Sequence, residues 1–409
     1  MNYSDLDINL TDEQKAMRDT ARKFGMEVMR PAGIELDTFA DPADVIADGS
    51  VLWDVLRQYR ELGFHKRAMP KAVGGIMEDM DPVSGLLLAE EFGYADAGLA
   101  ISLGVAGHTF RYAAMSDDPE IQDWARAYIE DTECSMIGCW AITEPDHGSD
   151  WILAADPDFS DPRCAPSLKA VLKGDEYILT GQKSAWVSDG TIATHATVHV
   201  NLEPSRGMHG TGICVVPLDL PGVSRGKPLN KMGQRPLNQG ELFFEEVKIP
   251  KKYMVVSDYN LSQPLMQAIM TGANTGMGVL FGGLAKAAFD EALKYARERI
   301  QGGVPIFEHQ NIKLKLMDMF AMVESARSLV RRTSAFNAAN PPGSLPHAVA
   351  VKGLSTEAAF KVASEAIQIF GGNGLSKEYC IEKIFRDARA SMIEDGTNEA
   401  LALIGAVFL

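Results

Sequence analysis

A pair of acidic side chains near the C-terminus is the first feature able to carry chemistry. Glu394 and Asp395 follow the stretch RDAR (386–389) and precede GTNE (396–399), where a glycine opens a turn. A carboxylate at such a helix end can act as a general base if desolvation raises its pKa. A solvated acidic turn is the alternative, and these residues alone do not decide between the two.

Three further clusters hold residue types that bind cofactors. Segment 140–150 (WAITEPDHGSD) ends in small residues and hydroxyls that suit either a phosphate or a plain turn. In 181–190 (GQKSAWVSDG), the Trp ring and a nearby hydroxyl suit a planar cofactor, or the Trp is simply buried. In 368–374 (QIFGGNG), three glycines permit close ligand approach or stop a helix. No G-x-G-x-x-G occurs, so a dinucleotide would need another binding scheme.

The elements that position these clusters fall into three regions. The first third is helical: Thr11 and Gln14 form a capping-box signature, and helices are predicted over 51–62 and 82–92. From about residue 135, short β runs take over. They include a hairpin tip at 173–177 and strands at 198–202, 213–216 and 242–249.

Helical periodicity returns after about residue 260. Long helices with short loops, one of them over 346–370, predict an antiparallel bundle. The prediction is therefore a mainly α protein with a central β domain. It has an N-terminal helical domain (1–134), a β domain (135–255) and a C-terminal helical bundle (256–409). Residues 156–166 (DPDFSDPRCAP) form an inserted loop, either a surface excursion or a cover near the substrate entrance.

Composition limits the class of protein. The 409 residues are 46% hydrophobic and 23% charged, so a folded chain of two or three domains is expected. The net charge of −16 argues against binding nucleic acid or anionic lipid, although a local basic pocket remains possible. The five cysteines are scattered, without metal-type spacing, and the acidic N-terminus resembles no targeting peptide. We predict a cytoplasmic protein with no metal site.

Taken together and in order, the motifs resemble the acyl-CoA dehydrogenase family along essentially the whole chain. The predicted helix–β–helix order is also that family's architecture. The matching stretches are CWAITEPDHGSD (139–150), GQKSAWVSDG (181–190), GICVV (212–216), KMGQRPLNQGELFFEEVKIP (231–250), RERIQGGVPIFEHQ (297–310), QIFGGNGLSKEYCIEKIFRDAR (368–389) and DGTNEALALIGA (395–406).

The resemblance implies an FAD site between the β domain and the bundle. Ile142 and Thr143 would contact the flavin ring, and Ser149 with Gly148 the pyrophosphate. Trp186 would pack on the dimethylbenzene side and Ser188 would bond near N5. The other contacts implied within the same chain are Trp140, Thr397 and Glu399. Residues matching positions that hold a neighbouring subunit's FAD are Arg299, Gln310, Gln368, Gly371 and Gly372.

The resemblance also implies the reaction. A carboxylate removes the α-proton of an acyl-CoA thioester, hydride passes from the β-carbon to flavin N5, and an electron-transferring flavoprotein accepts the electrons. Many relatives carry Glu at the base, whereas this chain has Asp395, whose carboxylate is withdrawn by about 1.5 Å. Another subgroup places its base at a position that aligns with Ala273, which cannot titrate. Asp395 is therefore the predicted base, with Glu394 as the alternative.

An Asp base occurs in relatives with unusual substrates, so we predict a cyclic, aromatic or branched acyl group. Small residues at Gly272, Ala273 and Gly276 would widen the acyl pocket, or else allow close helix packing. The alternative function is a flavoprotein oxidase of the same fold acting on a non-CoA carbon acid such as a nitroalkane. A catalytically silent flavin-binding protein is the third. The resemblance further implies a homotetramer or a homodimer.

Overall fold

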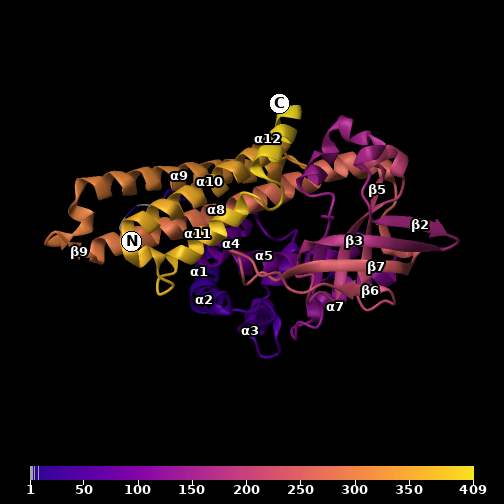
Figure 1. The fold of residues 1–409 in the computed structure, drawn as a ribbon, viewed down its shortest axis with the longest axis horizontal. Helices are drawn as coiled ribbons and strands as arrows, with labels where there is room; N and C mark the ends of the chain where they lie inside the picture. Colours follow the sequence, from indigo (N-terminus) through magenta and orange to yellow (C-terminus); the bar gives the residue numbers. More distant parts are fainter. Residues whose placement is uncertain (1–2, 4, 8) are drawn as a thin grey trace.

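The β-sheet comes between two helical regions in the order of the chain in the computed structural model, which describes residues 3, 5–7 and 9–409 (Figure 1). The sheet lies at one end of an elongated bundle, and the N-terminal helices lie along the bundle beside it. The predicted helix–β–helix order is confirmed. Among the described helices, none is long and apolar enough to cross a bilayer.

Short helices make up the N-terminal part. The predicted capping box is confirmed, since Gln14 N donates to Thr11 Oγ1 and Thr11 N donates to Gln14 Oε1. A π-helical turn over Gly25–Met29 interrupts the helical stretch there, where Gly25 lies against Ala95. The helices are α1 (Asp12–Phe24), α2 (Arg30–Thr38), α3 (Val51–Glu61), α4 (Pro82–Ala95), α5 (Ala97–Val105), α6 (His108–Ala114) and α7 (Pro119–Glu130).

The central sheet has the order β6-β7-β3-β2-β4-β5-β8, and β1 pairs in parallel with β4. The hairpin tip predicted at 173–177 joins β2 to β3, and the three predicted strands correspond to β4, β5 and β7. The buried apolar side chains of this β region form a hydrophobic core of their own. The strands are β1 (Gly138–Ala141), β2 (Lys169–Lys173), β3 (Glu176–Ser188), β4 (His195–Asn201), β5 (Thr211–Pro217), β6 (Val223–Arg225), β7 (Gln239–Pro250) and β8 (Met254–Val256).

Residues 156–166 pack on the protein surface as short 3₁₀ turns. Gly207 lies so close that a Cβ there would be 2.3 Å from Asp161 O. His209 Nε2 lies 3.1 Å from Asp156 O. The inserted loop is thus anchored to the turn Pro204–Gly210 rather than projecting freely.

The C-terminal bundle is built on α8, a helix of 37 residues that packs against α4, α9 and α10. Glycines set the closest approach of α4 to α8, because a Cβ on Gly93 would lie 2.0 Å from Leu280 O. The predicted helix 346–370 is α10. The bundle helices are α8 (Ser262–Glu298), α9 (Gln310–Ala339), α10 (Leu345–Phe370), α11 (Ile381–Ser391) and α12 (Asn398–Val407), with a small hairpin of β9 (Ile300–Gln301) and β10 (Val304–Pro305) between α8 and α9.

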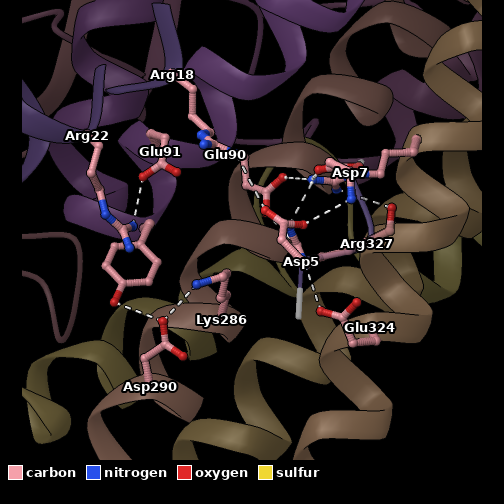
Figure 2. Close-up of polar contacts among 12 residues, drawn as sticks. Asp5, Asp7, Arg18, Arg22, Glu90, Glu91, Lys286, Asp290, Glu324 and Arg327 are labelled. Atoms are coloured by element: carbon pink, nitrogen blue, oxygen red, sulfur yellow. Dashed lines mark hydrogen bonds and ion pairs between the residues drawn. The ribbon is translucent and has the colours of Figure 1, made fainter. Parts of the chain in front are cut away.

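A charge network fastens the N-terminal segment and α4 to α9 (Figure 2). Arg327 Nε donates to Glu90 Oε1 at 2.6 Å, and Arg331 Nη2 donates to Glu90 Oε2 at 2.6 Å. Asp7 accepts from Arg331, and Glu324 accepts from Arg327. Because Glu90 and Arg327 are buried, loss of Glu90 would leave the two guanidinium groups with Glu324 and Asp7 to balance their charge away from water.

Replacing Glu90 with Gln should destabilise the fold by about 3 kcal/mol, because two guanidinium groups then lose their shared carboxylate. Urea unfolding followed by circular dichroism measures the change. Glu357→Gln is the matched control, since Glu357 pairs with Lys361 on the exposed face of α10 and should cost less than about 0.5 kcal/mol. Equal effects of the two substitutions would contradict a structural role for the network.

Candidate active site

The predicted base lies on a tight loop between α11 and α12. Asp395 and Gly396 both have left-handed backbones, with φ of +50° and +96°. Thr397 caps α12, because its Oγ1 accepts a hydrogen bond from Ala400 N. Thr397 N donates to Ser149 Oγ at 3.1 Å, so the loop is joined directly to the segment expected to meet the FAD pyrophosphate.

Both carboxylates of this loop are half-buried. Burial raises the pKa of Asp395, and the charge of Lys352 on α10 opposes that shift. Burial also raises the pKa of Glu394 to about 7. Glu394 Oε1 accepts from Gln234 Nε2 at 2.6 Å. Two carboxylates that titrate above their ordinary range in one loop suit proton transfer from carbon near neutral pH.

Trp186 and Ser188 lie on one face of β3, as their spacing of two requires. The Trp186 side chain is exposed (58%), and Ser188 is half-buried. Gln239 Nε2 donates to Ser188 Oγ at 3.1 Å and to Trp186 O at 3.3 Å. A large exposed ring beside an anchored hydroxyl fits the side of a planar flavin.

The end of β1 is held by a buried ion pair that the sequence reasoning missed. Lys183 Nζ donates to Glu144 Oε1 at 2.8 Å and to Ile142 O at 3.0 Å, and both charged side chains are fully buried. Thr143 O accepts from Ser184 N at 2.8 Å. The pair thus fixes the backbone of the two residues expected to contact the flavin ring. Glu144 lies in the motif 139–150 and Lys183 in the motif 181–190. Their opposite charges were the signal in the sequence that could have predicted this ion pair.

Trp140 has a different anchor. Its Nε1 donates to His199 Nε2 at 2.9 Å, and its ring lies 5.1 Å from that of His108. Burial lowers the pKa of His199 to about 3, so the imidazole is neutral and able to accept. His108 and His199 had no role in the sequence analysis, and here they orient Trp140.

The two residues expected at the pyrophosphate differ in what they offer. Gly148 is exposed, with no atom within 4 Å of where its Cβ would lie, so a ligand can approach its backbone closely. Its N–H, however, already donates to Asp150 Oδ1 at 2.6 Å. Ser149 Oγ accepts from Thr397 N and keeps its own hydrogen to donate. Ser149 is therefore the better phosphate donor of the two.

The other predicted FAD contacts fall into two groups, one at or next to the Asp395 loop and one at the far end of the bundle. Lys352, which contacts the Asp395 loop, and Gln368 are 16 residues apart on α10, so they are separated by about 24 Å. One flavin ring cannot touch both places. Thr397 ends the Asp395 loop, and the exposed Glu399 lies in the first turn of α12. The residues at the far end of the bundle, all exposed, are Arg299, Gln310, Gln368, Gly371 and Gly372.

Gly272 and Gly276 open a cavity of about 350 Å³ between α4, α8 and α9. Its lining includes Thr275 and Asn337 but neither Asp395 nor any predicted FAD contact. The glycines therefore widen a space distinct from the loop that carries the base. Ala273 is not among the lining residues.

Asp189 is a buried acid directly after β3. Its Oδ1 accepts from Ser102 Oγ at 2.8 Å and from Asn238 Nδ2 at 3.2 Å, which ties α5 and the segment before β7 to the end of β3. Its Oδ2 has no hydrogen-bond partner among the described residues. Burial raises the pKa of Asp189 to about 8, so this carboxyl is protonated at neutral pH.

Asp189→Asn should remove the loss of folding stability that comes from ionising the buried Asp189 carboxyl at high pH. Because the raised pKa makes folding take up a proton between about pH 4 and 8, wild-type stability falls as pH rises through that window. The melting temperature of the variant should therefore exceed that of wild type by about 2–5 °C more at pH 8 than at pH 5. The exposed Asp175→Asn is the control, expected to show no such trend. A difference that is constant with pH would rule out the protonated carboxyl.

Three family models match consecutive parts of the chain. Those described as the N-terminal, middle and C-terminal domains of acyl-CoA dehydrogenase match residues 11–116, 139–247 and 265–409. Their order is that of the N-terminal helices, the sheet and the bundle. The matches therefore account for all three layers of the fold.

Individual relatives are similar over nearly the full length. The chain is 29% identical to cyclohex-1-ene-1-carbonyl-CoA dehydrogenase of Syntrophus aciditrophicus (strain SB), covering 97% of this chain and 89% of that one. The structure of butyryl-CoA dehydrogenase from Megasphaera elsdenii superposes with a TM-score of 0.83 at 28% identity, covering 98% and 99%. A chain from a structure of the electron transferring flavoprotein of Acidaminococcus fermentans gives the same TM-score and identity, covering 98% of each.

Proposed function

Because the chain belongs to the acyl-CoA dehydrogenase family, whose members are FAD flavoproteins, we propose that Asp395 is the base in its dehydrogenation of an acyl-CoA thioester. The placement of Asp395 carries this proposal. Its loop is half-buried and is joined through Thr397 N and Ser149 Oγ to the segment expected to bind FAD. Base and cofactor would thus be held by one connected set of backbone contacts.

The chemistry divides between protein and cofactor. Asp395 takes the α-proton, and the electron pair left on the α-carbon forms the new double bond as hydride leaves the β-carbon. FAD, when bound, supplies the hydride acceptor at N5. Ser188 and Trp186 would orient the flavin ring, Ile142 and Thr143 would meet its face, and Ser149 would bind the pyrophosphate. The partial burial of Asp395 reduces the amount of water that can solvate the carboxylate.

We propose that the acyl group is cyclic, aromatic or branched. The argument is the shorter reach of Asp395, which requires the α-carbon to lie closer to the loop than a Glu base would. Ala273 provides no second carboxylate on α8. The similarity to a cyclohex-1-ene-1-carbonyl-CoA dehydrogenase supports this class, whereas the comparable similarity to a butyryl-CoA dehydrogenase does not favour it. The choice of substrate class therefore depends on the site, not on the degree of identity.

The same reasoning extends to partners. An electron-transferring flavoprotein is the proposed acceptor, supported by the chain from a structure of such a protein that superposes on this one. We further propose that the residues at the far end of the bundle complete the FAD site of a neighbouring subunit in a homotetramer or homodimer. The distance of about 24 Å along α10 supports this, because those residues cannot reach the flavin of their own chain.

Asp395→Asn should leave a folded, yellow protein that reduces its flavin at least about 100-fold more slowly, because the amide cannot accept the α-proton. Anaerobic stopped-flow absorbance of the flavin measures the rate. Glu394→Gln is the matched comparison: it should keep most of the activity if Asp395 is the base. Near wild-type reduction by Asp395→Asn, with loss in Glu394→Gln, would move the base to Glu394.

An anaerobic titration with a panel of acyl-CoAs tests the substrate class. Cyclic, aromatic or branched compounds should bleach the flavin faster than butyryl-CoA and longer straight chains. A clear preference for straight chains would contradict the proposed class. Bleaching by nitroalkanes but by no acyl-CoA, with fast reoxidation in air, would instead establish the oxidase alternative.

A further inference from the structure

Lys352 is a buried cation without an ion-pair partner in the part of the chain that the structure describes. Three lysines of the described chain are buried: Lys183, Lys352 and Lys383. Lys183 pairs with Glu144, and Lys383 pairs with Asp96 and Asp387. Within the described residues, no carboxylate lies within 4 Å of Lys352, although its side chain is fully enclosed. An ammonium group in that position is costly, so its retention calls for a physical reason.

The hydrogen bonds of Lys352 go to the loop that carries the base. Its Nζ donates to Gly396 O at 2.8 Å and to Asn398 Oδ1 at 2.8 Å. Thr356, one turn further along α10, holds the Asn398 amide at 3.0 Å. Lys352 thus holds the loop from α10 through Gly396 O, while Ser149 Oγ holds it at Thr397 N. The left-handed backbone of Asp395 needs such support, whereas Gly396 adopts its angles without strain.

The charges that face Lys352 all belong to the same region. They are Asp395 and Glu394 on the loop and Glu399 on α12. Burial lowers the pKa of Lys352 to about 8, and these three carboxylates oppose the shift. Of the charged groups around Asp395, Lys352 is the one that favours its ionised form, while Lys231 acts on Glu394. The positive charge of Lys352 and the negative charge of Asp395 therefore stabilise each other without direct contact.

We propose that Lys352 is a positioning residue for Asp395, fixing the loop through Gly396 O and keeping the carboxylate ionised until it receives the substrate proton. This inference rests on the proposed function, because it assumes that Asp395 is the base. It predicts that removal of the charge alters the ionisation of the base as well as the rate. If Lys352 only filled space, replacing it would change neither the pH profile nor the conformation of the loop.

Two substitutions separate charge from hydrogen bonding. Lys352→Met keeps the length of the side chain but removes both, and Lys352→Gln removes the charge while retaining a donor. Lys361→Met, on the exposed face of the same helix, is the matched control. The measurement is the rate of anaerobic flavin reduction from pH 5.5 to 9 in the FAD-loaded enzyme, with the acyl-CoA that bleaches the wild type best. Asp395→Asn is measured in parallel.

Lys352→Met should slow flavin reduction at least about tenfold at pH 7 and move the acidic limb of the profile up by about one pH unit, because the base loses its neighbouring cation. Lys352→Gln should move the acidic limb of the pH profile by the same amount but keep more of the rate at high pH. Lys361→Met should match wild type. If Asp395→Asn is inactive and Lys352→Met keeps the wild-type limb, the inference is overturned while the proposed base stands.

Activity of Asp395→Asn would overturn the proposed base itself, and the inference would fall with it. Thermal melting gives a readout that does not depend on turnover. Because the pKa of Lys352 is lowered in the folded state, folding releases a proton between about pH 8 and 10.5, so wild-type stability should rise there relative to Lys352→Met. A difference in melting temperature that is flat over this window would contradict a buried, charged Lys352.

Discussion

A carboxylate that takes a proton from carbon must be shielded from water and yet remain ionised, and burial alone works against ionisation. Asp395, the proposed base, is half-buried, and Lys352 lies near it without forming an ion pair. A direct ion pair would hold the carboxylate more strongly and make it a poorer proton acceptor. The longer-range arrangement of Lys352 lowers the cost of the charged base while leaving its oxygens free for the substrate.

The same device, a buried lysine, also joins distant segments around the site. Lys183 connects the β1 end to β3 through Glu144, and Lys383 connects α11 to Asp96, which caps α5. Each such contact is specific in direction as well as charge, unlike the apolar cores that it borders. The network of Glu90 with Arg327 and Arg331 extends this pattern to the N-terminal segment (Figure 2).

Much of the fold follows from the sequence because periodicity reports burial. The capping box at Thr11, the hairpin at 173–177 and the helix at α10 were all predictable from local pattern. The order of motifs identified the family, and that resemblance predicted Asp395 as the base. What local pattern could not give was the meeting of residues far apart in the chain, such as Ser149 with Thr397.

Lys352 shows what the sequence could not predict and also a signal in the sequence that was overlooked. Lysine is normally a surface residue, so its place in a helix attracts no attention. Yet it lies on the buried face of α10, with the buried residues Ala348 and Val349 before it and Ser355 and Thr356 after it. A charge on the buried face of a helix predicts an unusual environment, although its partner cannot be known until the loop between α11 and α12 is placed.

The backbone of that loop gives a physical reason for aspartate at the base. Among residues other than glycine, Asp and Asn tolerate left-handed angles best, and a longer side chain at φ of +50° would cost about 1–2 kcal/mol. The loop is fixed both by Ser149 and by Lys352, so it cannot simply advance to recover the 1.5 Å or so that Asp395 lacks. Under the proposed mechanism the adjustment falls on the substrate, whose α-carbon would lie deeper toward the loop. The proposed cyclic, aromatic or branched acyl group has bulk near the thioester that would help to hold the α-carbon there, whereas a slender straight chain has less.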